Sequence, residues 1–287
     1  FTDSQISVGA PYFNRMAAPI GAAIVFMMGV GPALPWGRTQ PAVMVKRLAL
    51  PAGLGVAVSG IALAMGFVDF WPVLTYGLST FAFVVTIQQI IEPARARSKA
   101  LGESFGKAMA TVAVRTRRRF GGYIVHIGVL CIAVAHATAT AYLVKERVTF
   151  VEHQETVVGD YAVTYIGSEW QEQPHRNSMV ARFKVTRDGR DLGVVEPRLN
   201  HYKSMGSPIG TPEVRSGLDE DLYLSLINVD PAAGTASLEI LIQPLVWWLW
   251  FGGGVMGFGT LIAGFPTIRR RKPSAQPVLD DVRAAGK

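Results

Sequence analysis

Long apolar runs occupy the first half of the chain, and a further run lies near its C-terminal end. Each run holds roughly 18 or more residues with almost no charged side chain, enough to cross about 30 Å of hydrocarbon as an α-helix. The pattern predicts membrane-spanning helices at Ala17–Trp36, Leu48–Val68, Phe70–Ile91, Tyr123–Val144 and Leu245–Phe265. Charged residues make up only 17% of the chain, below the roughly 25% of soluble domains, which supports this interpretation.

The segment 145–243 has a different pattern, in which short alternating runs are separated by Gly, Pro, Asp and Asn. Alternation with a period of two is typical of half-buried strands, and these separators are typical of turns. The pair Asp188-Gly189 between two such runs predicts a hairpin, and the sequence DPAAG at 230–234 predicts a turn between two more strands. The segment is therefore expected to form a small β domain tied to the membrane at both ends.

The predicted fold class is an integral membrane α-helical bundle of about five spans with a small extracytoplasmic β domain. The expected organisation is four helices within 1–144 that include a basic cytoplasmic loop at 93–119, a β-rich domain at 145–243, a final helix at 244–266 and a cytoplasmic tail at 267–287.

The charge distribution indicates an orientation in the membrane. The segment 93–119 carries eight basic residues and one acidic residue, and short loops rich in Lys and Arg stay in the cytoplasm. The N-terminus of this chain is therefore expected outside and its C-terminus inside. The net charge is +7, but segment 145–243 has ten basic and fifteen acidic residues, so it is net −5 and the remainder is net +12. Because this excess lies beside the membrane, it does not indicate a nucleic-acid partner.

Few residues suggest chemistry by their type alone. The single cysteine, Cys131, lies within a predicted span, which excludes an intrachain disulfide and a metal site built on paired cysteines. His153, His175 and His201 lie in the β domain without the spacing of a metal site. The aromatic cluster at 247–250 is typical of a membrane-interface anchor, although it could also be a docking face for a haem or quinone.

His126 is the exception, because an ionisable side chain within a membrane span is costly unless it finds a partner. Gly122 and the small residues Ala133 and Ala137 share its helix face, which leaves space for a flat, bulky group. An imidazole can ligate haem iron, or it can form a hydrogen bond with a neighbouring helix, and the pattern leaves both open. His136 is ten residues further on, about 15 Å along the helix and rotated by about 280°, so the two cannot hold one haem.

Several segments together resemble a known family. They are ISVGAPYFNRM at 6–16, RRRFGGYIVHIGV at 117–129, VVEPRLNHY at 194–202, DLYLSL at 221–226 and the closing run QPLVWWLWFGGGVMGFGTLIA at 243–263. In this order they are similar to the C-terminal half of CcmF, the integral-membrane haem lyase component of cytochrome c maturation. The glycine-rich part of the closing run also predicts close packing against another helix.

The resemblance implies that His126 is an axial ligand of a membrane-embedded haem b and that His136 has a structural role. It also implies that haem is a substrate attached covalently to apocytochrome c, in the bacterial inner membrane and with the β domain in the periplasm. Expected partners are apocytochrome c, haem-chaperone and thiol-reducing subunits, and quinol.

The family's other haem-binding segments belong to an N-terminal half that this sequence does not contain. The chain is therefore expected to be a fragment or a subunit of a split enzyme, incomplete as a haem lyase by itself, with the second ligand of His126-bound iron supplied by another polypeptide region. One alternative is a non-catalytic scaffold whose β domain docks apocytochrome c or its chaperones. A transporter is a weaker alternative, because the sequence lacks a repeated pair of broken, charged helices.

Overall fold

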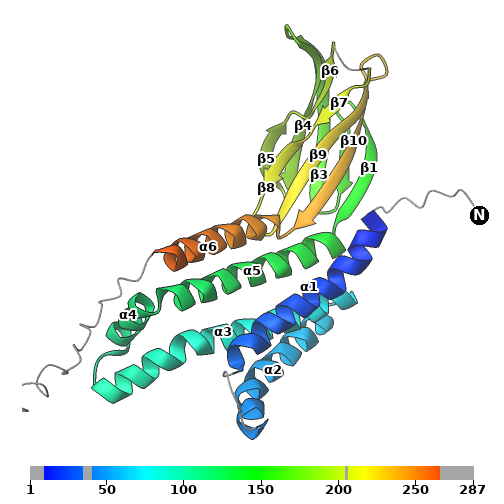
Figure 1. The fold of residues 1–287 in the computed structure, drawn as a ribbon. Coiled ribbons are helices and arrows are strands. Elements are labelled where there is room, and N and C mark those ends of the chain that lie inside the picture. The colour runs from blue at the N-terminus through cyan, green and yellow to red at the C-terminus, as the bar shows by residue number, and fades with distance from the viewer. Residues whose placement is uncertain (1–9, 35–40, 204–205, 266–287) are drawn as a thin grey trace, which may run out of the picture.

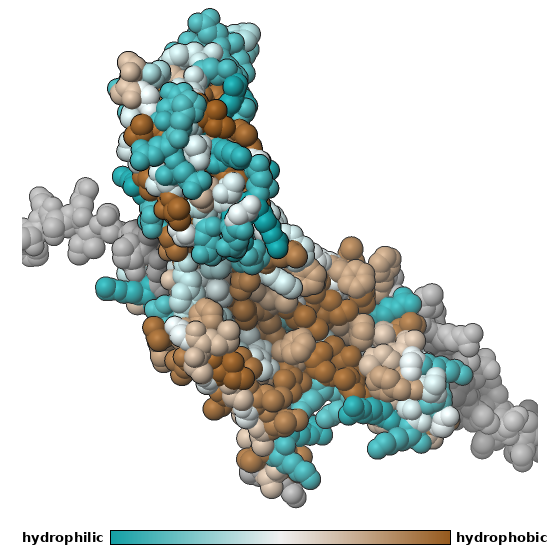
Figure 2. Space-filling view, turned by 180° about the vertical axis from the view of Figure 1, so that it is seen from behind, coloured by the Kyte–Doolittle hydropathy of each residue, from teal (hydrophilic) through white to brown (hydrophobic). Residues whose placement is uncertain are grey.

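A helical bundle with a β domain projecting from one end makes up the computed structural model, which describes residues 10–34, 41–203 and 206–265 (Figure 1). Within the described residues, five helices are long and apolar enough to cross a membrane, which confirms the predicted fold class. On the face shown in Figure 2, hydrophobic residues predominate over the middle of the bundle and hydrophilic residues lie along its lower edge, whereas the β domain carries more hydrophilic residues. The tail expected at 267–287 lies outside the described residues. The helices are α1 Ala10–Ala33, α2 Pro41–Ala64, α3 Phe70–Leu101, α4 Phe105–Arg115, α5 Arg117–Ala141 and α6 Val246–Gly264.

The basic segment 93–119 is largely helical, not the loop that the charge pattern suggested. Helix α3 continues to Leu101, α4 follows after a short turn, and α5 begins at Arg117. Gly102 ends α3 in the left-handed conformation, with φ of 63°, and an ion pair between Arg97 and Glu103 closes the turn. The prediction followed the apolar runs alone, but Ala, Lys and Arg also favour helix and carry it beyond the hydrocarbon.

Helix α3 is central in the bundle and contacts α1, α2 and α5, while α6 packs along α5. Glycines on both helices let α5 and α6 approach closely. A Cβ atom on Gly128 would lie 2.6 Å from the carbonyl oxygen of Gly252, and one on Gly121 would lie 2.5 Å from that of Gly259. This confirms the predicted close packing of the glycine-rich last helix.

The β domain consists of two antiparallel sheets. One sheet has the order β1 (Val144–Val151), β10 (Thr235–Pro244), β9 (Glu220–Asp230) and β8 (Glu213–Ser216); the other has the order β2 (Glu155–Val158), β3 (Tyr161–Glu172), β4 (Arg176–Arg187), β6 (Arg198–Tyr202) and β7 (Ile209–Thr211), with β5 (Arg190–Val195) also paired to β4. Strands from both sheets contribute fully buried side chains to one core, including Phe150, Phe183 and Leu238. The predicted β domain is therefore confirmed.

Both turns predicted in the β domain are present. Asp188 and Gly189 have φ values of 49° and 74° between β4 and β5, as expected for a two-residue hairpin turn. Between β9 and β10, a side-chain oxygen of Asp230 accepts hydrogen bonds from the amides of Ala232 and Ala233. These contacts fix the register of long strands whose core side chains must all face the same side.

The β domain is joined to α5 and α6 by two paired strands and by a loop that contacts α6. Helix α5 leads into β1, and β10 leads into α6, and the two strands are paired from Val144↔Ile242 onward. In addition, the loop 217–220, which includes the first residue of β9, docks on the start of α6. Leu245 donates its amide to the Asp219 carbonyl at 2.8 Å, and Trp248 donates its indole N–H to the Leu218 carbonyl at 2.9 Å. The paired strands therefore hold the adjoining ends of α5 and α6 side by side.

Ionic contacts attach this loop to the body of the β domain. The guanidinium of Arg187 lies 2.7 Å from a carboxylate oxygen of Asp219 and 3.0 Å from a carboxylate oxygen of Glu220. The Glu220 carboxylate also accepts a 2.9 Å hydrogen bond from the hydroxyl of Tyr161. Burial alone would raise the pKa of Asp219, but hydrogen bonds from Arg187 and from backbone amides hold it below its usual value. The loop is thus linked on one side to strand β4 and on the other to helix α6.

Trp248→Phe should loosen this junction, because it removes the indole N–H but keeps an aromatic ring. Loss of one hydrogen bond of about 1 kcal/mol corresponds to about fivefold faster hydrogen–deuterium exchange of the loop 217–220. Trp250→Phe is the matched control, since Trp250 is 79% exposed. Equal exchange in both variants would contradict the proposed contact.

Candidate functional site

Helix α5 uses two faces for packing within the bundle. Gly121, Gly128 and Ile132 face α6, as shown by the close approach of Gly259 and Gly252. Leu130 belongs to a cluster with Val25 of α1 and Ala82 of α3, and Ala133 packs against it. His126 is one helical turn before Leu130, on the same side of α5 and away from the α6 contact.

The imidazole of His126 is half-buried, and its Nδ1 atom is fully buried without a hydrogen-bond partner among the described residues. The ring meets that of Tyr123 edge-on, with 6.4 Å between the ring centroids. A buried polar nitrogen without a partner costs about 1–3 kcal/mol, so the position of this imidazole is not explained by a hydrogen bond of Nδ1 within the described residues. The interhelical hydrogen bond considered as the alternative role is not formed by Nδ1 within the described part of the chain.

Space is available beside His126. A Cβ atom built on Gly122, one turn earlier, would meet no atom within 4 Å. This glycine therefore differs from Gly121 and Gly128, where a Cβ would collide with α6. The absence of a side chain at Gly122 is not required by packing inside the described bundle, and it leaves room next to the imidazole.

These features fit one side of a haem site. A half-buried imidazole in apolar surroundings can supply one axial ligand, and the open position at Gly122 can accommodate the edge of a flat macrocycle. The described residues include no cluster of three or more His, Cys, Asp and Glu side chains that could hold a metal ion. His136 is exposed on the helix surface, and helix geometry directs it away from His126.

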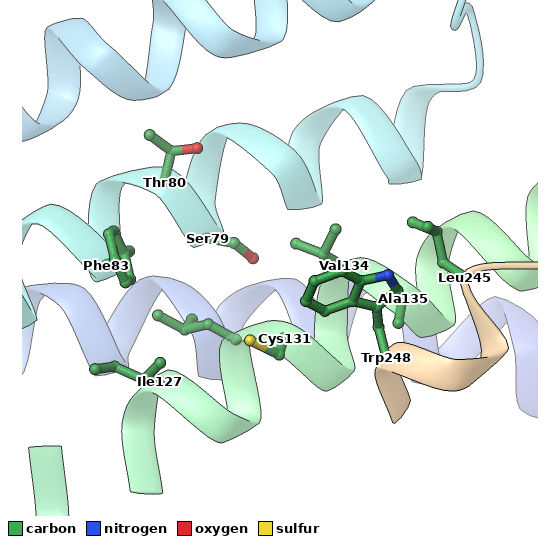
Figure 3. Close-up of a pocket in the computed structure, with 10 residues that line it drawn as sticks. Ser79, Thr80, Phe83, Ile127, Cys131, Val134, Ala135, Leu245 and Trp248 are labelled. Carbon is green, nitrogen blue, oxygen red and sulfur yellow. The ribbon is translucent and has the colours of Figure 1, made fainter. Parts of the chain in front are cut away.

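A cavity of about 440 Å³ lies between α3, α5 and the start of α6 (Figure 3). Its walls are almost entirely apolar, but Ser79 points into it, is only 4% exposed, and has an Oγ atom without a partner among the described residues. The lining residues are Ser79, Thr80, Phe83, Ile127, Leu130, Cys131, Val134, Ala135, Leu245 and Trp248. An apolar pocket with a few polar groups is the usual form of a small-molecule site.

His126 does not line this cavity, but Ile127 and Leu130 do. The cavity therefore lies on the neighbouring face of α5, within one turn of the imidazole. Sequence inspection gave no indication of Ser79 or Cys131 as cavity residues, since each is a single small residue within an apolar run. The pairing of α3 with α5, including a 2.9 Å hydrogen bond between Tyr76 and Thr138, is what brings them together.

The remaining candidate residues are separate from this region. His153, His175 and His201 are exposed in the β domain, and the ring of His201 lies 5.4 Å from that of Trp170. In the aromatic cluster at 247–250, Trp248 contacts the β domain and Trp247 stacks on Phe251, with 5.6 Å between the ring centroids. Trp247 and Trp248 therefore have a packing role at the junction between α6 and the β domain.

The part of the chain that the structure describes contains five helices of membrane-spanning length and a folded β domain at one end, an arrangement that defines a multi-pass membrane protein. No protein-family model matches the chain. It is similar to the cytochrome c-type biogenesis protein CcmF of Pseudomonas aeruginosa, with 26% identity over 262 residues that cover 91% of this chain and 38% of the relative. The Escherichia coli CcmF is 25% identical over 272 residues, covering 95% and 40% of the two chains.

A solved structure named cytochrome c heme lyase CcmF is also similar, with a TM-score of 0.69 and 29% sequence identity over 90% of this chain and 41% of that one. The chain is accordingly similar to CcmF proteins over about nine tenths of its length, which agrees with the resemblance that the sequence motifs indicated. It spans about two fifths of the length of the curated relatives that it matches.

Proposed function

We propose that this chain is one part of a haem lyase that attaches haem covalently to apocytochrome c. The observation that carries the proposal is the unpartnered, half-buried imidazole of His126 beside the open position at Gly122, within a CcmF-type fold. The similar curated proteins act in cytochrome c biogenesis, and the similar structure is named a heme lyase. The chain would act in a bacterial inner membrane, with its β domain and N-terminal end on the periplasmic side.

A haem b bound at this place would supply one-electron redox chemistry. The chain would contribute His126 as one axial ligand and the space at Gly122, together with apolar helix surfaces that exclude water. The second ligand would come from a polypeptide region beyond the described residues. Quinol is a suitable electron donor, and the cavity beside Ser79, one turn from His126, has the size and apolar walls to admit such a molecule.

The second haem in this function is the substrate. Each of its two vinyl groups would react with one thiol of a Cys-x-x-Cys-His motif in the client. The sulfur and the hydrogen of the thiol add across the vinyl double bond, which forms a thioether. Cys131 lies within membrane helix α5 and offers no thiol to this reaction. Haem-chaperone and thiol-reducing subunits are the expected partners, since haem and reduced client thiols must both be supplied.

Deletion of the coding sequence tests the proposal directly. We expect the deletion strain to lose covalently bound haem from its c-type cytochromes, measured by haem staining after denaturing electrophoresis. Restoration by the wild-type chain and by Cys131→Ser is expected, because no step uses that thiol. Unchanged haem staining in the deletion strain would exclude a role in cytochrome c maturation.

A non-catalytic scaffold remains the alternative function, and the paired strands β1 and β10 allow a clean test. Since Val144 and Ile242 are direct neighbours across these strands, a short Gly-Ser linker can replace 145–241 without separating α5 from α6. Intact complex assembly without cytochrome maturation would favour a client-binding role of the β domain. Failure of the other subunits to assemble would favour the scaffold.

A further inference from the structure

A second cavity, of about 210 Å³, lies at the end of the bundle far from the β domain. It is formed where α4 ends, α5 begins and α6 ends, and its lining residues are Ala113, Val114, Arg117, Phe120, Ile262 and Phe265. Arg117 is the one charged side chain among them. Among the described residues, the cavity therefore combines apolar walls with one cationic group, at the end of the bundle far from the β domain.

The positive charge around this cavity is not balanced within the described residues. Arg115, Arg117, Arg118 and Arg119 lie within five residues, and none of them forms an ion pair with another described side chain. The first turn of α5 contains no acidic residue. The positive end of the helix dipole adds to the same charge, so an anion bound there would lower the electrostatic free energy.

The apolar walls of the cavity would be covered by a hydrophobic group and not by an anion. Val114 and Phe265 are 54% and 63% exposed, and they continue the apolar lining toward the surface of the bundle. A free inorganic anion would neutralise the arginines but would leave these side chains uncovered. A molecule with an anionic head and a hydrocarbon chain meets both requirements, and the bilayer that surrounds the helices contains such molecules.

We infer that this cavity is a binding site for an anionic phospholipid of the bilayer. The phosphate pairs with Arg117, with Arg118 or Arg119 close enough in sequence to assist, and one acyl chain lies along Val114, Phe120 and Ile262. The site is independent of haem and of the proposed lyase function, because it uses only residues at the far end of the bundle. Its consequence is that α4, α5 and α6 are held together by lipid where their own side chains leave a gap.

The test uses the purified full chain in detergent with added phosphatidylglycerol or phosphatidylcholine, and native mass spectrometry to count the retained lipid. We expect selective retention of phosphatidylglycerol by the wild type. Arg117→Gln should weaken it about fivefold, the effect of one basic group near a membrane surface. Arg95→Gln is the matched control: it removes the same charge from an exposed position at the same end of the bundle and should leave retention unchanged.

Ala113→Phe provides a second variant, since it fills the cavity but keeps every arginine. Ala113→Phe should weaken phosphatidylglycerol retention as Arg117→Gln does. If the lipid were only attracted to the arginines at the protein surface, filling the cavity would leave its retention unchanged. The inference is overturned if Arg95→Gln and Arg117→Gln weaken retention equally, if both cavity variants retain lipid like the wild type, or if inorganic phosphate displaces the phospholipid. If Ala113→Phe does not fold, the comparison of the two arginine variants decides alone.

Discussion

His126→Ala should abolish the reduced b-type haem absorbance of the purified complete complex, while His136→Ala should leave it unchanged. The expectation follows from the different surroundings of the two imidazoles: His126 has a buried nitrogen without a partner and open space beside it, whereas His136 lies exposed on the helix surface. In the proposed site, this substitution would remove the iron ligand that the chain supplies. The measurement is the difference spectrum of reduced and oxidised complex per mole of protein.

Gly122 offers a further control for the same site. Gly122→Ala should be tolerated because the added Cβ meets no atom within 4 Å, whereas Gly122→Leu should reduce haem content by filling the space beside the imidazole. Size-exclusion chromatography of each variant separates loss of haem from loss of assembly. An undiminished haem spectrum in His126→Ala, or an equal loss in His136→Ala, would refute axial ligation by His126.

Gly252→Val is expected to have the second large effect, on the stability of the helix pair α5–α6. A Cβ at this position would lie 2.8 Å from the Gly128 carbonyl oxygen and 2.7 Å from a side-chain carbon of Ile132, so the helices must separate. Overpacking of this kind costs about 1–3 kcal/mol. Thermal unfolding of the purified chain, followed by the helical circular dichroism signal, should show a clearly lowered midpoint.

Gly254→Val is the matched control on the same helix. Its Cβ would meet no atom within 4 Å, and the two variants change helix propensity by the same amount. A similar midpoint for both would mean that α5 and α6 do not rely on backbone contact at Gly252. The contact with α6 occupies one face of α5, and His126 lies on a different face. The α5–α6 contact therefore leaves the imidazole available to other groups.

The spans and the β domain could be predicted because each follows from a local pattern. A run of apolar residues must bury its backbone polar groups as a helix in hydrocarbon, and alternation with turn residues favours strands. His126 could be singled out for a related reason, since a polar group among apolar neighbours is costly wherever the helix packs. The haem role of His126, in contrast, came from resemblance and stays a prediction.

The helical form of one segment, the cavity and the junction with the β domain could not be predicted from local sequence patterns. The helical form of segment 93–119 was missed because its charged side chains hide its helix propensity. The cavity at Ser79 depends on how α3 pairs with α5, and the junction at Trp248 depends on a loop that is 30 residues away in sequence. The type of neither residue indicates these contacts; Trp250, for example, is a tryptophan of the same helix that is 79% exposed.

Sequence alone determined which segments of this protein enter the membrane, which form strands, and which imidazole is out of place, because these depend on the polarity of each residue and its neighbours along the chain. Tertiary structure alone decided which glycines of α5 contact α6, that Gly122 remains open, and where the cavities and the junction with the β domain form. Those properties arise from distances between segments, and helix periodicity places residues on a face without stating what lies opposite.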